Sequence, residues 1–182
     1  MCSLTPLSTT DPEYQNIISH FDLTPSSYVI HSILKIQMEW TFTNRFDNVV
    51  MWPWKKPDTF QLFHGTKHAC DVWELNNSNK LCDNTQCGVC GILKFGNLLK
   101  MAKPNFAGQY LWFSPRASYV HKYTGPLKPH DNGFRAMFVM NVVFGMHYLK
   151  SIITDCEENV LPKYLIIYKE NFENIENKEE IL

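Results

Sequence analysis

The fold is decided by FRAMFVMNVVFGMHYL, residues 134–149. This long and mostly apolar run has β character, because β-branched and aromatic side chains are frequent in it. A second run, LPKYLIIYKE at residues 161–170, is apolar through its middle and predicts a final strand that is buried there. Together the two runs predict a β core near the C-terminal end of the chain.

Shorter elements are predicted upstream of this core. Residues 13–21, EYQNIISHF, place apolar side chains at helical spacing. Residues 28–46, YVIHSILKIQMEWTFTNRF, fit either an amphipathic helix or β-branched strand material, and the pattern alone does not decide. Further strands are predicted at 60–66 and 109–114, and further helices at 92–100, broken at Gly96, and at 115–123, opened by a proline. Strands separated by short helices predict an α+β domain with a mainly antiparallel β core.

The composition is that of a globular protein with one domain. At 182 residues the chain is long enough for one hydrophobic core and short for two. Residues 1–12 are rich in Ser, Thr and Pro, and we expect them to be disordered. Residues 13–170 are expected to form the domain. Residues 171–182 are acidic and are expected to be a tail, either a frayed helix or disordered.

Charge and hydropathy exclude several classes of function. The formal net charge of −1 provides no surface for neutralising many phosphates, so general nucleic-acid binding is not expected. No stretch approaches the ~20 apolar residues that a membrane-spanning helix needs. The N-terminus lacks the basic start and apolar run of a signal peptide. We therefore expect an intracellular protein, cytoplasmic or nuclear, that does not bind membranes.

Four cysteines gather in an irregular, polar stretch: Cys70, Cys82, Cys87 and Cys90. In CGVCG, residues 87–91, two thiolates separated by two residues can reach one ion, and glycine frees the amides around it. Tetrahedral zinc needs four ligands, and this stretch supplies four. The pattern predicts a structural Zn²⁺ ion that staples an otherwise irregular insertion by closing its loops.

Other interpretations of these cysteines remain open. They can be small buried apolar residues, and His68 can replace Cys70 as a ligand. Redox use of CGVCG is a minor alternative, because no thioredoxin-like strand and helix surround it. Cys2 and Cys156 lie elsewhere in the sequence and are interpreted as ordinary thiols.

Five blocks occur in a characteristic order: LFHGT, CGILKFGNLL, GQYLWFS followed by ASYVHKY, FVMNVVFG and VLPKYLIIY. They resemble the catalytic domain of the poly(ADP-ribose) polymerases (PARPs) over residues 28–168, and residues 28–46 resemble the helix that leads into that family's core. The cysteine-rich stretch is similar to a divergent PARP-like branch. The resemblance implies the ADP-ribosyltransferase fold, NAD⁺ as substrate, release of nicotinamide, and an unidentified acceptor, with a protein as the first candidate.

The resemblance also implies a nicotinamide pocket. His64 matches the histidine that hydrogen-bonds the adenine ribose, and Gly65 matches the glycine whose backbone binds the carboxamide. Tyr123 matches the tyrosine that stacks on the nicotinamide. A flat cationic ring favours an aromatic face, and glycine allows a ligand to approach the backbone closely. The plainer interpretations are a hydrogen-bonded histidine at a strand end for His64 and a core aromatic residue for Tyr123.

The helix and strand around this pocket depart from the family pattern. Trp112 stands where the family has its second signature tyrosine, so the phenol oxygen is missing there. Ser118 lies near the helix position that contributes hydroxyl groups. The serine that usually bonds the carboxamide is replaced by Val120.

The largest departure concerns catalysis. Ser151 stands where the family has its catalytic glutamate, and Glu157 and Glu158 are not expected to replace it because they lie next to the turn before the last strand. Polymer synthesis needs a group that activates an acceptor hydroxyl, so mono-ADP-ribosylation is expected instead. The alternative is a catalytically inactive PARP-like pseudoenzyme that binds a ligand or partner. A third interpretation is a small zinc-binding interaction protein.

Overall fold

The computed structural model describes residues 2–23, 27–51, 57–104, 108–128, 133–143, 146–148 and 150–171. The strands are β1 (Ser3–Pro6), β2 (Tyr28–Gln37), β3 (Thr59–Gly65), β4 (Leu111–Phe113), β5 (Phe134–Val143), β6 (Met146–Tyr148), β7 (Ser151–Thr154) and β8 (Val160–Glu170). The α-helices are α1 (Pro12–His20), α2 (Trp40–Val50), α3 (Leu75–Ser78), α4 (Gly88–Phe95) and α5 (Ala117–Val120). Short 3₁₀ helices are η1 (Val72–Glu74), η2 (Leu99–Met101), η3 (His121–Tyr123) and η4 (Glu157–Asn159).

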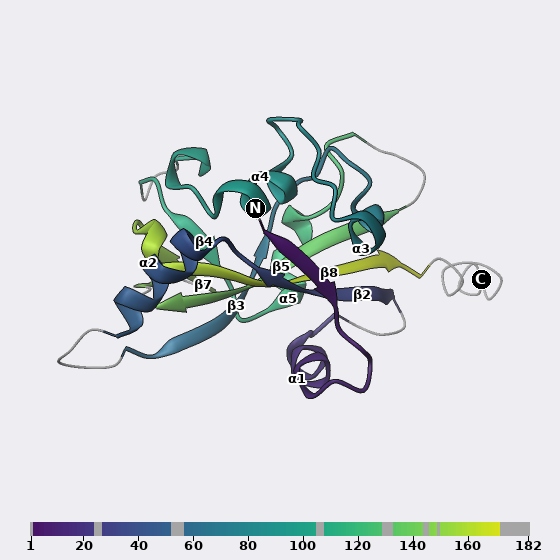
Figure 1. Ribbon diagram of the computed structural model, residues 1–182, viewed down its shortest axis with the longest axis horizontal. Helices are drawn as coiled ribbons and strands as arrows, with labels where there is room; N and C mark the ends of the chain where they lie inside the picture. Colours follow the sequence, from purple (N-terminus) through teal and green to yellow (C-terminus); the bar gives the residue numbers. More distant parts are fainter. Residues whose placement is uncertain are drawn as a thin grey trace, which may run out of the picture.

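Two antiparallel sheets form the framework. The larger has five strands in the order β1-β2-β8-β5-β3, and the smaller has three in the order β4-β7-β6 (Figure 1). Phe63 on β3 and Ser114 after β4 join the sheets through two backbone hydrogen bonds of 2.8 and 3.0 Å. The prediction of an α+β protein with a mainly antiparallel β core is confirmed.

The central strands β5 and β8 are buried on both faces. On β5, Met137 and Phe138 are neighbours in sequence, and each is fully buried in a different hydrophobic cluster. One cluster lies on the face covered by α2 and α4, and the other on the face covered by α1 and α5. The strand predictions for 134–149 and 161–170 are confirmed where the structure describes them, and β5 ends at Val143.

Residues 28–46 form neither one helix nor one strand. They comprise β2 followed by the start of α2, so the helix that the family resemblance implied is wrong for Tyr28–Gln37. Ile33 and Leu34 are adjacent and both 0% exposed, one in each cluster, so the alternation that marks a half-buried strand is absent. Trp40, the first residue of α2, is 73% exposed.

The predictions for the N-terminal stretch can be compared with the structure, whereas most of the C-terminal tail lies outside the described residues. The N-terminal stretch was expected to be disordered, and this is wrong for Ser3–Pro6, which pairs with β2 as an edge strand. The helix predicted at 13–21 is confirmed as α1; Asp11 caps it by accepting the Glu13 N–H at 2.7 Å. The predicted acidic tail lies outside the described residues apart from Asn171.

The helix predicted at 92–100 has different limits. It begins four residues earlier, at Gly88, and ends at Gly96, whose φ of +74° favours glycine. Residues 99–101 form the separate turn η2. The early start matters because it places Cys87 at the N-cap of α4 and Cys90 in its first turn. The predicted elements at 60–66, 109–114 and 115–123 are confirmed as β3, β4 and α5 with η3.

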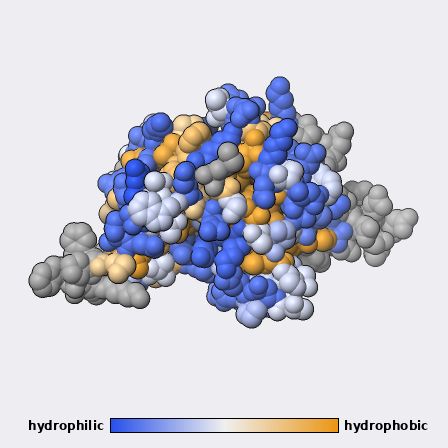
Figure 2. Space-filling model, in the orientation of Figure 1, coloured by the Kyte–Doolittle hydropathy of each residue, from blue (hydrophilic) through white to orange (hydrophobic). Residues whose placement is uncertain are grey.

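Polar side chains cover most of the face drawn in Figure 2, with apolar side chains exposed between them. Within the described ranges, the helices are all too short or too polar to cross a membrane.

Candidate metal centre and the neighbouring polar network

The four predicted cysteines come together in one cluster. Cys70 follows β3, Cys82 follows α3, Cys87 is the N-cap of α4 and Cys90 lies in its first turn. Their sulfur atoms all lie within 4.8 Å of one another. The Cys70 Sγ is 3.8 Å from the Cys87 Sγ and 3.5 Å from the Cys90 Sγ. This cluster could hold a metal ion, as the spacing predicted.

The size of the cluster matches a tetrahedral thiolate site. A Zn–S bond of about 2.3 Å requires neighbouring sulfurs to lie roughly 3.8 Å apart in a regular tetrahedron. No disulfide joins the described cysteines. Hydrogen bonding among the thiols lowers the pKa of Cys87 and raises that of Cys70. Four protein ligands leave no open position, which is the arrangement of a structural metal site.

A lysine fixes the Cys82 side of the cluster. Lys94 Nζ, on α4, donates to the Cys82 carbonyl at 2.6 Å and to the Asp83 carboxylate at 2.8 Å. The Cys82 N–H donates to the Cys90 Sγ at 3.4 Å. Hydrogen bonds of this kind orient the ligands around a metal.

The start of α4, which carries two of the cysteines, also contacts the chain just after β3. The Gly88 N–H donates to the Lys67 carbonyl at 2.9 Å. A Cβ at position 88 would overlap the Thr66 hydroxyl, so only glycine allows this approach. The second residue of CGVCG therefore couples α4 to the segment that follows His64 and Gly65.

His64 and Gly65 lie against the Trp112 backbone and the Tyr123 turn. The His64 Nδ1–H donates to the Trp112 carbonyl at 2.8 Å, and burial lowers the pKa of His64. The neutral ring therefore leaves Nε2 as an acceptor. A Cβ on Gly65 would lie 2.8 Å from the Val120 carbonyl oxygen and 3.1 Å from the Tyr123 Cβ. The structure thus brings together three of the predicted residues and the backbone of Trp112.

Tyr123 lies in a small group of hydroxyl-bearing residues with Tyr119 and Ser151. Its ring centroid is 6.2 Å from that of Tyr119, and Lys122 Nζ lies 4.4 and 5.0 Å from the two centroids. The pKa of Tyr119 is lowered, first by its interaction with Tyr123 and also by Ser151. Ser151, at the start of β7 and 5% exposed, therefore lies near this group.

Ser118 is engaged elsewhere. Its hydroxyl donates to the Asp22 carboxylate at 2.7 Å, and its N–H donates to the same carboxylate at 2.8 Å. These bonds tie α5 to the segment after α1. Glu157 accepts the Leu99 N–H at 2.5 Å, and Glu158 accepts the Cys156 thiol at 3.1 Å. Both glutamates line a groove with Phe42 and residues 95–98.

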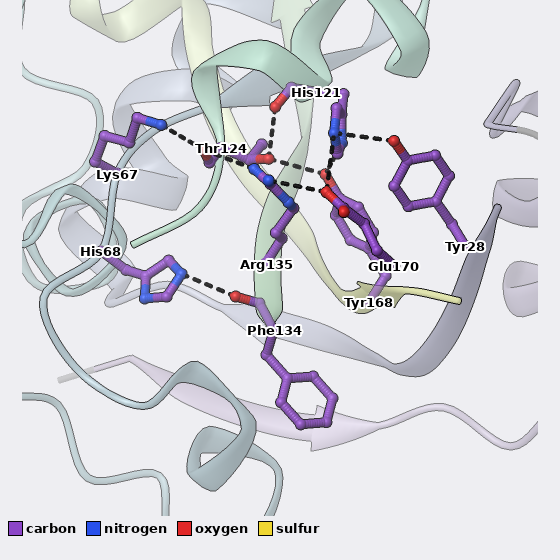
Figure 3. Close-up of polar contacts among 9 residues, drawn as sticks. All are labelled: Tyr28, Lys67, His68, His121, Thr124, Phe134, Arg135, Tyr168 and Glu170. Carbon is purple, nitrogen blue, oxygen red and sulfur yellow. Dashed lines mark hydrogen bonds and ion pairs between the residues drawn. The ribbon is translucent and has the colours of Figure 1, made fainter. Parts of the chain in front are cut away.

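A buried chain of hydroxyl groups holds the turn after Tyr123 (Figure 3). The Thr124 hydroxyl donates to the His121 carbonyl at 2.7 Å, so it accepts from the Tyr168 hydroxyl at 2.9 Å. The Tyr168 oxygen then accepts the His121 Nδ1–H at 3.0 Å, and His121 Nε2 accepts from the Tyr28 hydroxyl at 3.2 Å. Burial, followed by the charge of Arg135, lowers the pKa of His121. A neutral His121 ring, with one N–H donor and one acceptor nitrogen, therefore satisfies every hydrogen bond in this chain of hydroxyls.

Two cations meet the carbonyl of Thr124 from different elements (Figure 3). Lys67 Nζ donates to it at 2.6 Å and Arg135 Nη1 at 3.3 Å. Arg135 Nη2 also donates to the Glu170 carboxylate at 3.0 Å. The residue after Lys67 also bonds this turn: the backbone N–H of His68 donates to the Gly125 carbonyl at 3.1 Å.

The sequence did not predict this network of His121, Thr124, Tyr168, Lys67 and Arg135. Its members come from two strands, one 3₁₀ helix and two loops, and no spacing links them. The one available signal was Lys67, which directly follows the His-Gly-Thr block. No protein-family model and no curated protein matches the chain, so the family resemblance stays a prediction and the geometry has to carry the functional argument.

Proposed function

We propose that this protein is an NAD-dependent ADP-ribosyltransferase that modifies its acceptor with single ADP-ribose units, and that its thiol cluster holds one structural zinc ion. The observation that carries the proposal is the packing of Tyr123 against Gly65 at the end of β3, beside His64. The proposal includes the ADP-ribosyltransferase fold, which the two antiparallel sheets are compatible with.

The backbone of Gly65 suits recognition of a carboxamide. Phe63 directs its N–H and C=O away from β5, toward Ser114. Backbone groups alternate along an antiparallel strand, so those of Gly65 point to the same side as those of Phe63. A donor and an acceptor at this edge can pair with the oxygen and the NH₂ of nicotinamide. Tyr123, 48% exposed, offers its ring to the cationic nicotinamide.

His64 is placed to bind a ribose hydroxyl. Its Nδ1–H is used on Trp112, so Nε2 can accept a hydrogen bond from that hydroxyl. Because burial keeps the imidazole neutral, it adds no positive charge beside the cationic ring.

The reaction breaks the bond between C1′ of the ribose and the nicotinamide nitrogen. The acceptor forms a new bond to C1′ and loses a proton, while nicotinamide leaves with the bonding electron pair. Binding the dinucleotide in a fixed orientation lowers the barrier to this cleavage. Ser151 brings no negative charge, and the neighbouring Tyr119, whose pKa is lowered, is a phenol. Repeated elongation needs stronger activation of a hydroxyl, so a polymer is not expected.

The zinc ion has a structural role in this proposal. The cluster contacts Lys67 through Gly88 and so holds the chain that follows Gly65. Four thiolates close the coordination sphere, so the ion takes no part in the chemistry.

The proposal is tested by incubating the purified protein with NAD⁺ labelled in both the nicotinamide and the adenosine. We expect nicotinamide release and single ADP-ribose units on protein. His64→Ala should abolish release, whereas His20→Ala, at an exposed position on α1, should retain it. Wild-type protein that releases no nicotinamide, with any of a panel of cell-extract acceptors, would refute the enzymatic proposal.

A second candidate function is an inactive module that binds NAD⁺ without turning it over. The uncharged and buried Ser151, in place of a carboxylate, is the observation that favours it. A ligand that binds only the native state raises the melting temperature. NAD⁺ that raises the Tm without nicotinamide release would select this candidate over the enzyme. Absence of both effects would leave a zinc-binding interaction protein.

A further inference from the structure

Lys67 and Arg135 are held close together although their charges repel each other. Arg135 contributes to lowering the pKa of Lys67, after burial. Both side chains meet one oxygen atom, the carbonyl of Thr124, which cannot neutralise two full charges. Within the described part of the chain, Glu170 is the carboxylate bonded to Arg135, and Lys67 bonds none. His121 is neutral, so this group carries one net positive charge.

Several donors of these two cations remain available. Lysine has three N–H groups, and among the described residues Lys67 uses one of them on Thr124. Arginine has five, and with described partners Arg135 uses two of them, in the bonds to Thr124 and Glu170. Lys67 is exposed, and a quarter of the Arg135 side chain is accessible to solvent. The remaining donors can therefore reach a ligand from solvent.

Position 125 has to be glycine for Arg135 to pack where it does. A Cβ at this position would lie 2.7 Å from Arg135 Nη1 and 3.9 Å from Lys67 Nζ. The φ of +98° is also unfavourable for any other residue. Glycine at position 125 therefore allows Arg135 to approach the backbone beside the Thr124 carbonyl, where Lys67 also donates.

We infer that Lys67 and Arg135 form a binding site for a phosphate group. A phosphate has several acceptor oxygens and a charge that offsets the surplus positive charge. Arginine binds such an anion through its planar fork of donors and lysine binds it as a point charge. The site does not depend on the proposed transferase activity, and Tyr123, two residues before Gly125, places it near the proposed dinucleotide.

The experiment measures binding of inorganic phosphate and of ADP-ribose, at constant ionic strength set with chloride. Lys67→Gln is the test variant, because glutamine loses the charge but can still donate to the Thr124 carbonyl. Lys100→Gln, at an exposed position on η2, is the matched control. Loss of a hydrogen bond to a charged group predicts that Lys67→Gln binds phosphate about tenfold more weakly, while Lys100→Gln binds as the wild type does.

The two ligands distinguish the source of the phosphate. If ADP-ribose also loses about tenfold in Lys67→Gln and competes with inorganic phosphate, the site takes the phosphate of a nucleotide. If inorganic phosphate binds without competition from ADP-ribose, it takes a separate phosphate. The inference is overturned if the wild-type protein binds phosphate no more tightly than chloride. It is also overturned if Lys67→Gln binds phosphate as tightly as Lys100→Gln does. Neither readout depends on release of nicotinamide.

Discussion

The thiol cluster and the His121 network contact the same residue, Lys67, but they are completed in different ways. The cluster reaches its carbonyl through Gly88, and the network reaches its ammonium group through Thr124. In the network each of the hydroxyls and ring nitrogens has a protein partner. The cluster instead gathers four thiols, which are weak hydrogen-bond partners for each other. One region is stabilised by hydrogen bonds within the protein, and the other gathers four thiols that could hold an ion.

This difference concerns the candidate site directly. The end of β3, with His64 and Gly65, continues into Thr66 and Lys67, which lie between the two regions. The position of this segment therefore depends on the thiol cluster on one side and on a protein hydrogen-bond network on the other. Conditions that disturb only one region should separate their contributions.

Removing the metal should have the largest effect. A ligand present at 1,000 times its Kd stabilises the native state by about 4 kcal/mol, and a structural zinc ion in excess should contribute at least this much. We expect a strong chelator, or Cys87→Ser, to lower the free energy of unfolding by this amount in urea titrations. Cys156→Ser, outside the cluster, should leave the response to chelator unchanged. Equal stability with and without chelator would contradict the comparison.

Gly88→Ala should break the contact between the cluster and β3. Its methyl group would overlap the Thr66 hydroxyl, and overpacking of this kind costs about 1–3 kcal/mol. Gly91→Ala is the matched control on the same helix, because nothing lies within 4 Å of its Cβ position. Alanine in a helix interior should stabilise the protein there by roughly 0.5–1 kcal/mol. Thermal unfolding distinguishes the two variants. A melting temperature that changes in the same direction in both would contradict the proposed contact between Gly88 and the chain after β3.

Tyr168→Phe should disrupt the network without touching the cluster. It leaves the His121 Nδ1–H and the Thr124 hydroxyl without their shared partner, and Tyr168 is fully buried, so the cost should be about 1–3 kcal/mol. Tyr28→Phe removes the more accessible partner at Nε2 and should cost less. Urea unfolding measures both. If both variants lose a similar free energy of unfolding, the Tyr168 hydroxyl stabilises the network no more than the Tyr28 hydroxyl does.

Acidification should weaken the network through His121. Its pKa is lower in the folded protein than the ordinary value of about 6.5, so the unfolded chain binds the proton more readily. The contribution of His121 to stability is therefore full above about pH 6.5 and is lost as the pH falls through the folded pKa. The free energy of unfolding should fall by up to ~1.4 kcal/mol per pH unit in this window.

His121→Gln isolates this term, because His64 has a lowered pKa as well and contributes in the same direction. The difference in slope between wild type and variant, measured from pH 7.5 to 5.5, reports His121 alone. An identical pH slope would mean that His121 does not change protonation on unfolding.

The sequence predicted features whose signal is local. The spacing of Cys82, Cys87 and Cys90 anticipated the cluster, because metal ligands close in sequence need few conformations to meet. The buried strands β5 and β8 were found because they contain long, mostly apolar runs. The same property concealed β2, where Ile33 and Leu34 face opposite sides of the sheet and remove the alternation.

Features that depend on distant partners were missed. Ser3–Pro6 becomes a strand only by pairing with β2, and nothing in its polar composition predicts that. Tyr168 and His121 are 47 residues apart and meet because β8 passes under the turn after α5. Gly88 begins a helix although glycine disfavours one, since a side chain there would collide with Thr66.

The most direct test of this account is X-ray absorption at the zinc edge on freshly purified, reduced protein. We predict one zinc ion per chain with four sulfur neighbours at about 2.3 Å. Protein that contains no zinc, or zinc bound mainly by nitrogen and oxygen, would contradict the proposal that Cys70, Cys82, Cys87 and Cys90 hold the ion that fixes the end of β3.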